Sequence, residues 1–122
     1  VIFLGFQDNP REFLWAADIF VMPSLHEGFG VAAVEALASG VPVVFTCVPG
    51  LLDFGEYVPG IQWAEPNEQG LLNGIESLRQ KSYDERCHAA RKAAEIVKQR
   101  WGTKMGAERY LRQYFDTTVS EN

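Results

Sequence analysis

The sequence predicts an α/β fold in which helices cover both faces of a doubly wound parallel sheet. Short apolar runs occur at residues 1–4, 19–22 and 42–46. They are unbroken rather than alternating, which is typical of strands buried on both faces. Helical patterns fall between these runs, and alternation of strand and helix favours right-handed crossovers between parallel strands.

The first apolar run, residues 1–4, is expected to be a buried strand, and a chain that begins inside its sheet is expected to be a fragment. A short helix should follow because Pro10 suits a first helical turn and Asn9 can cap it. The next helix is expected over residues 29–39, ending at Gly40, since Pro42 prevents its continuation. A weaker strand pattern covers residues 61–64.

Beyond Glu65 the pattern predicts helices that flank the sheet. Their expected ranges are residues 67–78, 83–100 and 103–115. The first should bury a stripe at i, i+3, i+4 spacing, formed by Leu71, Leu72, Ile75 and Leu78. In the last segment the aromatic spacing favours a packing role for Trp101, Tyr110 and Tyr114.

Composition bounds the class of protein. With 122 residues, 47% of them hydrophobic and 12% aromatic, the chain can form one packed domain or part of one. The net charge of −5 gives no reason to expect nucleic acid or an anionic membrane surface as partner. No apolar run is long enough to span a bilayer. Cys47 and Cys87 lack a metal-type spacing and are expected to be free thiols of a reducing cytoplasm.

Two glutamates eight positions apart, Glu27 and Glu35, flank a glycine-containing turn. Open parallel sheets bind ligands beyond the carboxyl ends of their strands, where the turn is expected. Gly28 and Gly30 allow close backbone approach, and the helix start that follows suits a diphosphate. Glu35 lies two turns into the helix, but helical side chains lean toward the N-terminus. The core-facing stripe predicted for this helix places Glu35 at its edge and comprises Val31, Val34, Leu37, Ala38 and Val41.

The segment from Glu27 to Glu35, with residues 16–24 before it and 36–44 after it, resembles the nucleotide-sugar signature of family-4 glycosyltransferases of the GT-B fold. Residues 3–8 resemble the family's strand and nucleobase loop, and residues 101–110 resemble its closing helix. The likeness is strong over residues 1–50, weak over 51–95 and moderate thereafter. It implies a Rossmann-like C-terminal domain that binds the sugar donor.

The resemblance also implies roles for individual residues. Glu27 would contact the donor sugar and count as catalytic, and Glu35 would hold the ribose hydroxyls. Main-chain amides of the turn would meet the sugar and phosphates, and the loop containing Phe6 and Gln7 would lie against the base. The amides concerned belong to Gly28, Phe29, Gly30 and Val31. The implied enzyme is retaining and needs no metal or other cofactor.

The resemblance implies that residues 1–122 are the donor-binding domain of a two-domain enzyme whose acceptor-binding N-terminal domain precedes Val1. The partners would be a nucleotide-diphosphate sugar and an acceptor glycan or lipid-linked glycan, in polysaccharide or glycoconjugate synthesis, with no nucleic acid. The location would be cytoplasmic, with peripheral contact at the inner face of the membrane left open. The chain alone is expected to be inactive because a cleft between domains needs both.

The sequence departs from the family pattern at residues 47–50, Cys-Val-Pro-Gly, where a turn with two glycines is more usual, and at Asp53, where glutamate is more usual. We expect these changes to affect the acceptor side and not the donor signature.

Other interpretations stay open. Phe29 can be a hydrophobic staple, His26 and Arg11 can be plain surface residues, and an acidic pair can arise by chance. The function can instead be that of a nucleotide-sugar epimerase or a sugar phosphorylase of related fold. A non-catalytic α/β interaction module would also carry this pattern, and Glu35→Ala would then alter stability only.

Overall fold

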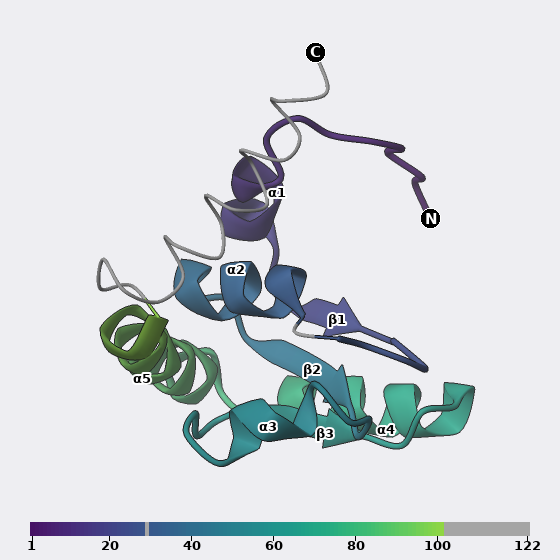
Figure 1. Ribbon diagram of the computed structural model, residues 1–122. Helices are drawn as coiled ribbons and strands as arrows, with labels where there is room; N and C mark the ends of the chain where they lie inside the picture. Colours follow the sequence, from purple (N-terminus) through teal and green to yellow (C-terminus); the bar gives the residue numbers. More distant parts are fainter. Residues whose placement is uncertain (29, 102–122) are drawn as a thin grey trace.

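The computed structural model describes residues 1–28 and 30–101. Its three strands, β1 (Phe20–Met22), β2 (Val43–Thr46) and β3 (Gln62–Ala64), form one parallel sheet in the order β1-β2-β3 (Figure 1). The helices are α1 (Arg11–Ala16), α2 (Val31–Ser39), α3 (Leu52–Gly55), α4 (Glu68–Gln80) and α5 (Tyr83–Trp101). The predicted α/β fold with a parallel, Rossmann-like sheet is confirmed.

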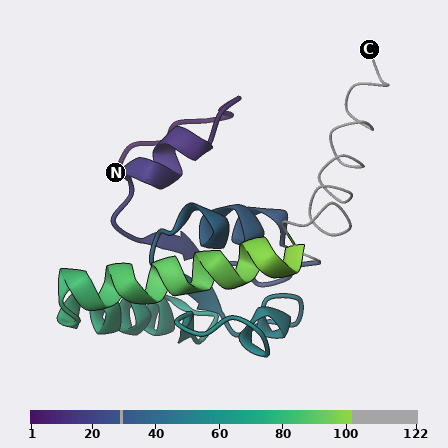
Figure 2. The same cartoon turned by 90° about the vertical axis from the view of Figure 1, so that its left-hand side faces the viewer.

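Helices cover both faces of the sheet, with β2 in the centre and buried along its whole length. Val43 and Phe45 point to the face that α2 and α5 cover, and Val44 points to the face that α4 covers. Figure 2 shows α5 running across the fold beside α2, with α4 on the far side of the sheet from α2. This two-sided cover explains why the strands are apolar without alternation.

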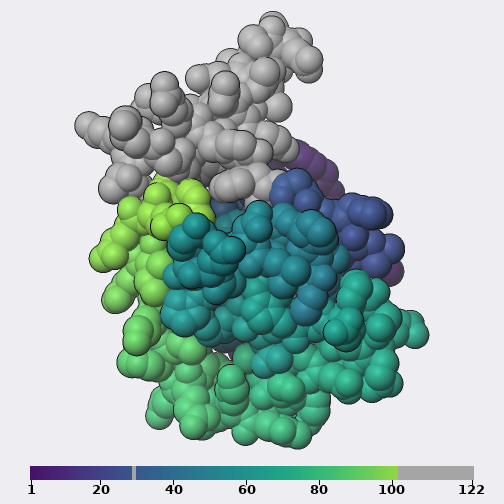
Figure 3. Space-filling view, turned by 60° about the horizontal axis from the view of Figure 1, so that its bottom comes forward, coloured from purple at the N-terminus to yellow at the C-terminus, as the bar shows by residue number. Residues whose placement is uncertain are grey.

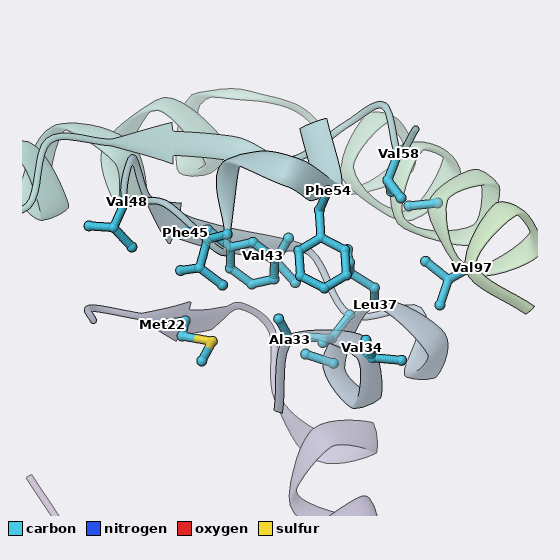
Figure 4. Packing of buried hydrophobic residues seen from close by; sticks show 14 residues of the cluster. Met22, Ala33, Val34, Leu37, Val43, Phe45, Val48, Phe54, Val58 and Val97 are labelled. Atoms are coloured by element: carbon cyan, nitrogen blue, oxygen red, sulfur yellow. The ribbon is translucent and has the colours of Figure 1, made fainter. Parts of the chain in front are cut away.

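The larger core centres on Phe45, which is fully buried (Figure 4). Its ring meets those of Phe20, Phe54 and Trp63 edge-on, with centroids 6.4, 6.4 and 6.2 Å away. Such T-shaped contacts add to the stabilisation from burial. The neighbouring strands and α3 are thereby fixed around the end of β2.

Helix α2 begins and ends at glycines in the left-handed region. Gly30, the N-cap, has φ of +76°, and Gly40, the C-cap, has φ of +79° and donates its N–H to the Leu37 carbonyl. The predicted end at Gly40 is confirmed, but the helix starts at Val31 rather than at residue 29, because the left-handed Gly30 precedes it. The core-facing stripe is also rotated from the predicted one: Ala33, Val34, Ala36 and Leu37 are buried, whereas Val31 and Ala38 are half-buried.

The prediction of a buried strand at residues 1–4 is wrong. These residues form no strand and are exposed, Phe3 to 93%. Within the described residues β1 pairs only with β2, so this apolar run has no neighbouring strand to complete its hydrogen bonds. An apolar run can be buried in a sheet, but a ladder also requires a partner.

Two smaller corrections concern helices. Pro10, not Asn9, precedes α1, and its carbonyl accepts the Leu14 N–H at 3.1 Å without any side-chain cap. In α4, Leu72 is 62% exposed, and the sheet-facing residues are Leu71, Ile75 and Leu78. The N-cap of this helix is Asn67, whose side chain accepts a hydrogen bond from the Gly70 N–H at 2.7 Å.

The structure also contains α3, which the sequence pattern did not predict, and it buries Phe54 in the core. Trp101 is half-buried and packs on Phe54, with the two ring centroids 5.4 Å apart, in agreement with its expected packing role. The predicted helix at residues 103–115, with Tyr110 and Tyr114, lies outside the described residues. None of the described helices combines the length and the hydrophobicity that crossing a bilayer requires.

Candidate functional site

The loop between β1 and α2 leaves the sheet at the carboxyl ends of the parallel strands (Figure 1). The turn that follows β2 leaves at the same edge and leads into α3. In Figure 3 this turn and α3 lie at the surface beside the loop that follows β1. Parallel sheets bind ligands at this edge, so the two loops are the candidate site.

Glu27 is half-buried and accepts a hydrogen bond, since the Ser24 hydroxyl donates to its Oε2 at 3.0 Å. The Ser24 carbonyl in turn accepts from the Thr46 hydroxyl at 2.6 Å. Thr46 ends the central strand and is fully buried, with a longer contact of 3.4 Å from its hydroxyl to the Met22 carbonyl. Hydrogen bonds therefore link the Glu27 carboxylate to the end of β2.

The turn after β2 approaches the same loop closely at Gly50. It has φ of +81°, and a Cβ placed on it would overlap the carbonyl oxygens of Glu27 and Gly28. The turn at residues 47–50 therefore packs closely against the backbone of Glu27 and Gly28. We expected its unusual sequence to affect only the acceptor side, and this close approach predicts that it also affects the segment that begins at Glu27.

The N-terminus of α2 differs from those of the two longer helices. At α4 the Asn67 side chain caps the first turn, and before α5 the side chains of Ser82 and Glu85 bond to each other's backbone N–H. The N-cap of α2 is Gly30, which makes no side-chain cap, and no acidic residue lies in the first turn. The positive end of the α2 dipole therefore faces no acidic side chain of its own first turn, and a bound anion would be stabilised there.

Glu35 lies in the second turn of α2 and is half-buried beside the buried stripe. Among the described residues nothing forms a hydrogen bond or ion pair with its carboxylate. A carboxylate accepts hydrogen bonds only, so the groups suited to it are donors such as paired hydroxyls. The structure therefore has Glu27 in the loop before α2 and Glu35 on the helix itself.

The remaining predicted site residues lie either at the start of α2 or in the N-terminal segment. Gly28 and Val31 flank the start of α2, Gly28 exposed and Val31 half-buried, whereas Phe29 lies outside the described residues. Phe6 is 91% exposed, and the Gln7 amide donates to the Leu4 carbonyl at 2.8 Å. No hydrogen bond within the described part of the chain joins residues 1–9 to the loop between β1 and α2. The base-contacting role of Phe6 and Gln7 therefore stays a prediction.

His26 and Arg11 keep their surface interpretation. His26 is exposed, and the Arg11 guanidinium lies 5.9 Å from the centre of the exposed Trp15 ring. Cys47 is a half-buried free thiol, and Asp53 is exposed in the first turn of α3. Across the described residues no three His, Cys, Asp or Glu side chains gather as metal ligands would.

Sequence reasoning missed Ser24, Thr46 and Gly50 as parts of this site. A threonine at the end of a buried apolar strand needs a hydrogen-bond partner, which was the available indication for Thr46. Its partner lies 22 positions earlier, so the pairing itself is not visible in the sequence.

Comparison with known proteins identifies the family and supports the fold. The family profile described as "Glycosyl transferases group 1" matches residues 1–97. An uncharacterized glycosyltransferase of Methanocaldococcus jannaschii is 37% identical over 64% of this chain and 21% of its own length. The N,N'-diacetylbacillosaminyl-diphospho-undecaprenol alpha-1,3-N-acetylgalactosaminyltransferase of Campylobacter jejuni is 32% identical over 93% of this chain and 30% of its own.

A solved structure is also similar. HepE of Anabaena, crystallised with UDP and glucose, superposes with a TM-score of 0.73 at 27% identity, covering 98% of this chain and 32% of that one. A crystal of the same protein with UDP-glucose gives a TM-score of 0.71 at 26% identity, covering 96% and 31%. This chain thus spans less than a third of the length of these proteins. Since the family profile covers most of its residues, the chain belongs to the group 1 glycosyltransferase family.

Proposed function

We propose that this chain is the donor-binding domain of a glycosyltransferase that moves a sugar from a nucleotide diphosphate to an acceptor hydroxyl. The observation that carries the proposal is the arrangement of Glu27 and Glu35 around the N-terminus of α2, which has no side-chain cap. Family membership supports the reaction class. The similar protein HepE, solved with UDP and with UDP-glucose, supports a nucleotide sugar as donor.

The proposed chemistry follows from the charge that develops in the reaction. As the glycosidic bond to phosphate breaks, the nucleotide diphosphate gains negative charge, and donors fixed before the reaction stabilise it best. We assign that role to the main-chain amides from Gly28 to Val31 together with the α2 dipole. Because these groups meet the diphosphate charge, we propose a transfer that needs no metal ion. Glu35 would accept from the ribose hydroxyls and Glu27 from the sugar.

The rest of the active site is proposed to come from a second domain. An acceptor-binding N-terminal domain would complete the cleft, so residues 1–122 alone would bind donor weakly and transfer nothing measurable. The Campylobacter jejuni relative is named for a diphospho-undecaprenol acceptor, and the proposed acceptor here is a glycan or lipid-linked glycan. The glycan would be assembled in the cytoplasm, where the free thiols Cys47 and Cys87 would stay reduced. With a lipid-linked acceptor, the enzyme would work peripherally at the inner face of the membrane.

Nucleotide binding tests the proposal. Titration calorimetry of the full-length protein with UDP, GDP and ADP should show one preferred nucleotide. Glu35→Ala should weaken its binding about tenfold or more, because a charged hydrogen bond is worth roughly 1.5–3 kcal/mol. The matched control is Glu95→Ala, an exposed glutamate of α5, which should leave affinity unchanged. If wild type binds none of the three, or if Glu35→Ala changes stability alone, the chain is an interaction module and the proposal fails.

The proposed retention of configuration needs its own test. With UDP-glucose as donor, 1H NMR in the first minutes of reaction should show the new linkage, or glucose released to water, in the α form of the donor. A β product would exclude retention. Product analysis with and without acceptor separates transfer from the rival activities, since an epimerase converts the donor without an acceptor and a phosphorylase requires inorganic phosphate.

A further inference from the structure

Ser24 stands between the end of the sheet and the Glu27 carboxylate. We propose that Ser24 is a positioning residue, anchored by Thr46, that holds Glu27 in the orientation in which it meets the donor sugar. The inference rests on the proposed function for the identity of the ligand. It adds two residues, neither of them in the Glu27–Glu35 signature, on which recognition of the sugar depends.

The hydrogen bond leaves one carboxylate oxygen for the ligand. The Ser24 hydroxyl donates a hydrogen bond to Oε2 of Glu27 at 3.0 Å, and no other described residue forms a hydrogen bond with the carboxylate. Oε1 is therefore available as an acceptor for a hydroxyl group. Without the Ser24 hydroxyl, a glutamate in a loop has several staggered orientations to choose from, and the productive one would be less populated.

The anchor of Ser24 lies at the end of the central strand, where it is fully buried. Thr46 is fully buried and pairs with Ala64 of β3, while its hydroxyl donates to the Ser24 carbonyl at 2.6 Å. That bond fixes the backbone of Ser24, and the Ser24 side chain then fixes Glu27. Binding sites supported in this way from secondary structure hold their geometry better than sites on unsupported loops.

Not every serine hydroxyl in the fold has such a connection. Ser39, half-buried at the end of α2, donates to the Ala36 carbonyl of its own helix at 2.6 Å and to no functional side chain. Ser24 and Ser39 therefore form a matched pair in which the hydrogen bond is kept and its partner differs.

The experiment compares sugar recognition with nucleotide recognition in the full-length protein. The variants are Ser24→Ala, Ser24→Thr, Glu27→Ala, the double variant Ser24→Ala/Glu27→Ala, and Ser39→Ala. Each is assayed for UDP affinity and for kcat/KM with UDP-glucose; GDP or ADP and their glucose conjugates replace these probes if wild type selects another base.

Ser24→Ala should lower kcat/KM about tenfold or more, the loss expected for one charge-assisted hydrogen bond, yet leave UDP affinity within about twofold. UDP carries no sugar, so a positioning role at the sugar leaves its binding intact, whereas general damage to the loop would weaken both. Ser24→Thr keeps the hydroxyl and should recover most of the activity, and Ser39→Ala should match wild type. In the Glu27→Ala background, removing Ser24 should cost nothing further, because Ser24 acts through Glu27.

Three results would overturn the inference: equal losses for UDP and UDP-glucose in Ser24→Ala, no recovery by Ser24→Thr, or additive losses in the double variant. If wild type neither binds nor uses any donor, the proposed function has failed, and the positioning inference is judged by NMR instead. The side-chain carboxyl carbon of Glu27 should then shift in Ser24→Ala and not in Ser39→Ala. An unmoved Glu27 signal would overturn it.

Discussion

Replacing Gly50 by alanine tests whether the turn after β2 supports the loop that contains Glu27 and Gly28. The substitution introduces two separate strains. Gly50 has φ of +81°, and a left-handed conformation costs a residue with a Cβ about 1–2 kcal/mol. The added Cβ would also overlap the Glu27 and Gly28 carbonyls, which adds about 1–3 kcal/mol, as overpacking does elsewhere. We expect Gly50→Ala to lose roughly 2–5 kcal/mol of stability.

Gly40 supplies the matched control because it separates these two terms. Its φ is +79°, nearly the same as at Gly50, but a Cβ on it would meet nothing within 4 Å. Gly40→Ala should therefore lose only the conformational part, about 1–2 kcal/mol. The difference between the two variants, measured by urea denaturation of the same protein, gives the free energy of the overlap.

The overlap is also expected to act on the site. We expect relief of the clash to displace the backbone at Glu27 and Gly28, and small displacements of a binding group are costly. Nucleotide affinity should fall about tenfold or more in Gly50→Ala and stay near wild type in Gly40→Ala. Equal stability losses in the two variants, with affinity preserved in both, would refute the view that this turn supports the loop.

Three further predictions concern stability. Thr46→Val keeps the shape of the buried side chain but leaves the Ser24 carbonyl without its 2.6 Å donor, so the urea midpoint should fall by the equivalent of about 1–3 kcal/mol, and Thr46→Ser should lose less. Phe45→Ala opens a cavity at the centre of the aromatic cluster and should cost about 3–5 kcal/mol in thermal unfolding; a loss below that of exposed Leu52→Ala would contradict it. Arg100→Gln removes the guanidinium 3.3 Å from the centre of the Tyr57 ring and should cost about 0.5–1 kcal/mol, unlike Lys98→Gln.

The sheet was predictable to the extent that its strands are apolar without interruption. β1 and β2 were found this way, and Gly40 and Pro42 marked the break between helix and strand. The same rule failed at residues 1–4, because hydrophobicity indicates that a segment can be buried and not that a neighbouring strand is there to pair with it. Helix α3 was missed because its four residues are too few to display a helical period.

The two glutamates of the site were found by a local spacing, and the residues that support them were not. Glu27 and Glu35 lie on one loop and the helix that follows it, so their proximity to a helix start can be read along the chain. Thr46 is 22 positions from Ser24 and reaches it only because β1 and β2 pair in parallel, with Met22 beside Phe45. Which side chain meets a strand end depends on the register, and the register cannot be read from the apolar pattern of a strand that is buried on both faces.

These contacts change how the departure at residues 47–50 is understood. The pairing of β1 with β2 sets the distance between their carboxyl ends, and both the Thr46 hydroxyl and the backbone of Gly50 act across that gap on the loop that begins at β1. Pro49 fixes one φ in the turn, which limits how far the backbone of Gly50 can move away from the Glu27 and Gly28 carbonyls. A turn with two glycines would retain more freedom at the same place. We infer that β2 sets the position of the loop that contains Glu27 and Gly28 as much as the loop's own sequence does. If that loop binds the sugar donor as proposed, substitutions at 46–50 should alter sugar recognition, although none of these residues belongs to the Glu27–Glu35 signature.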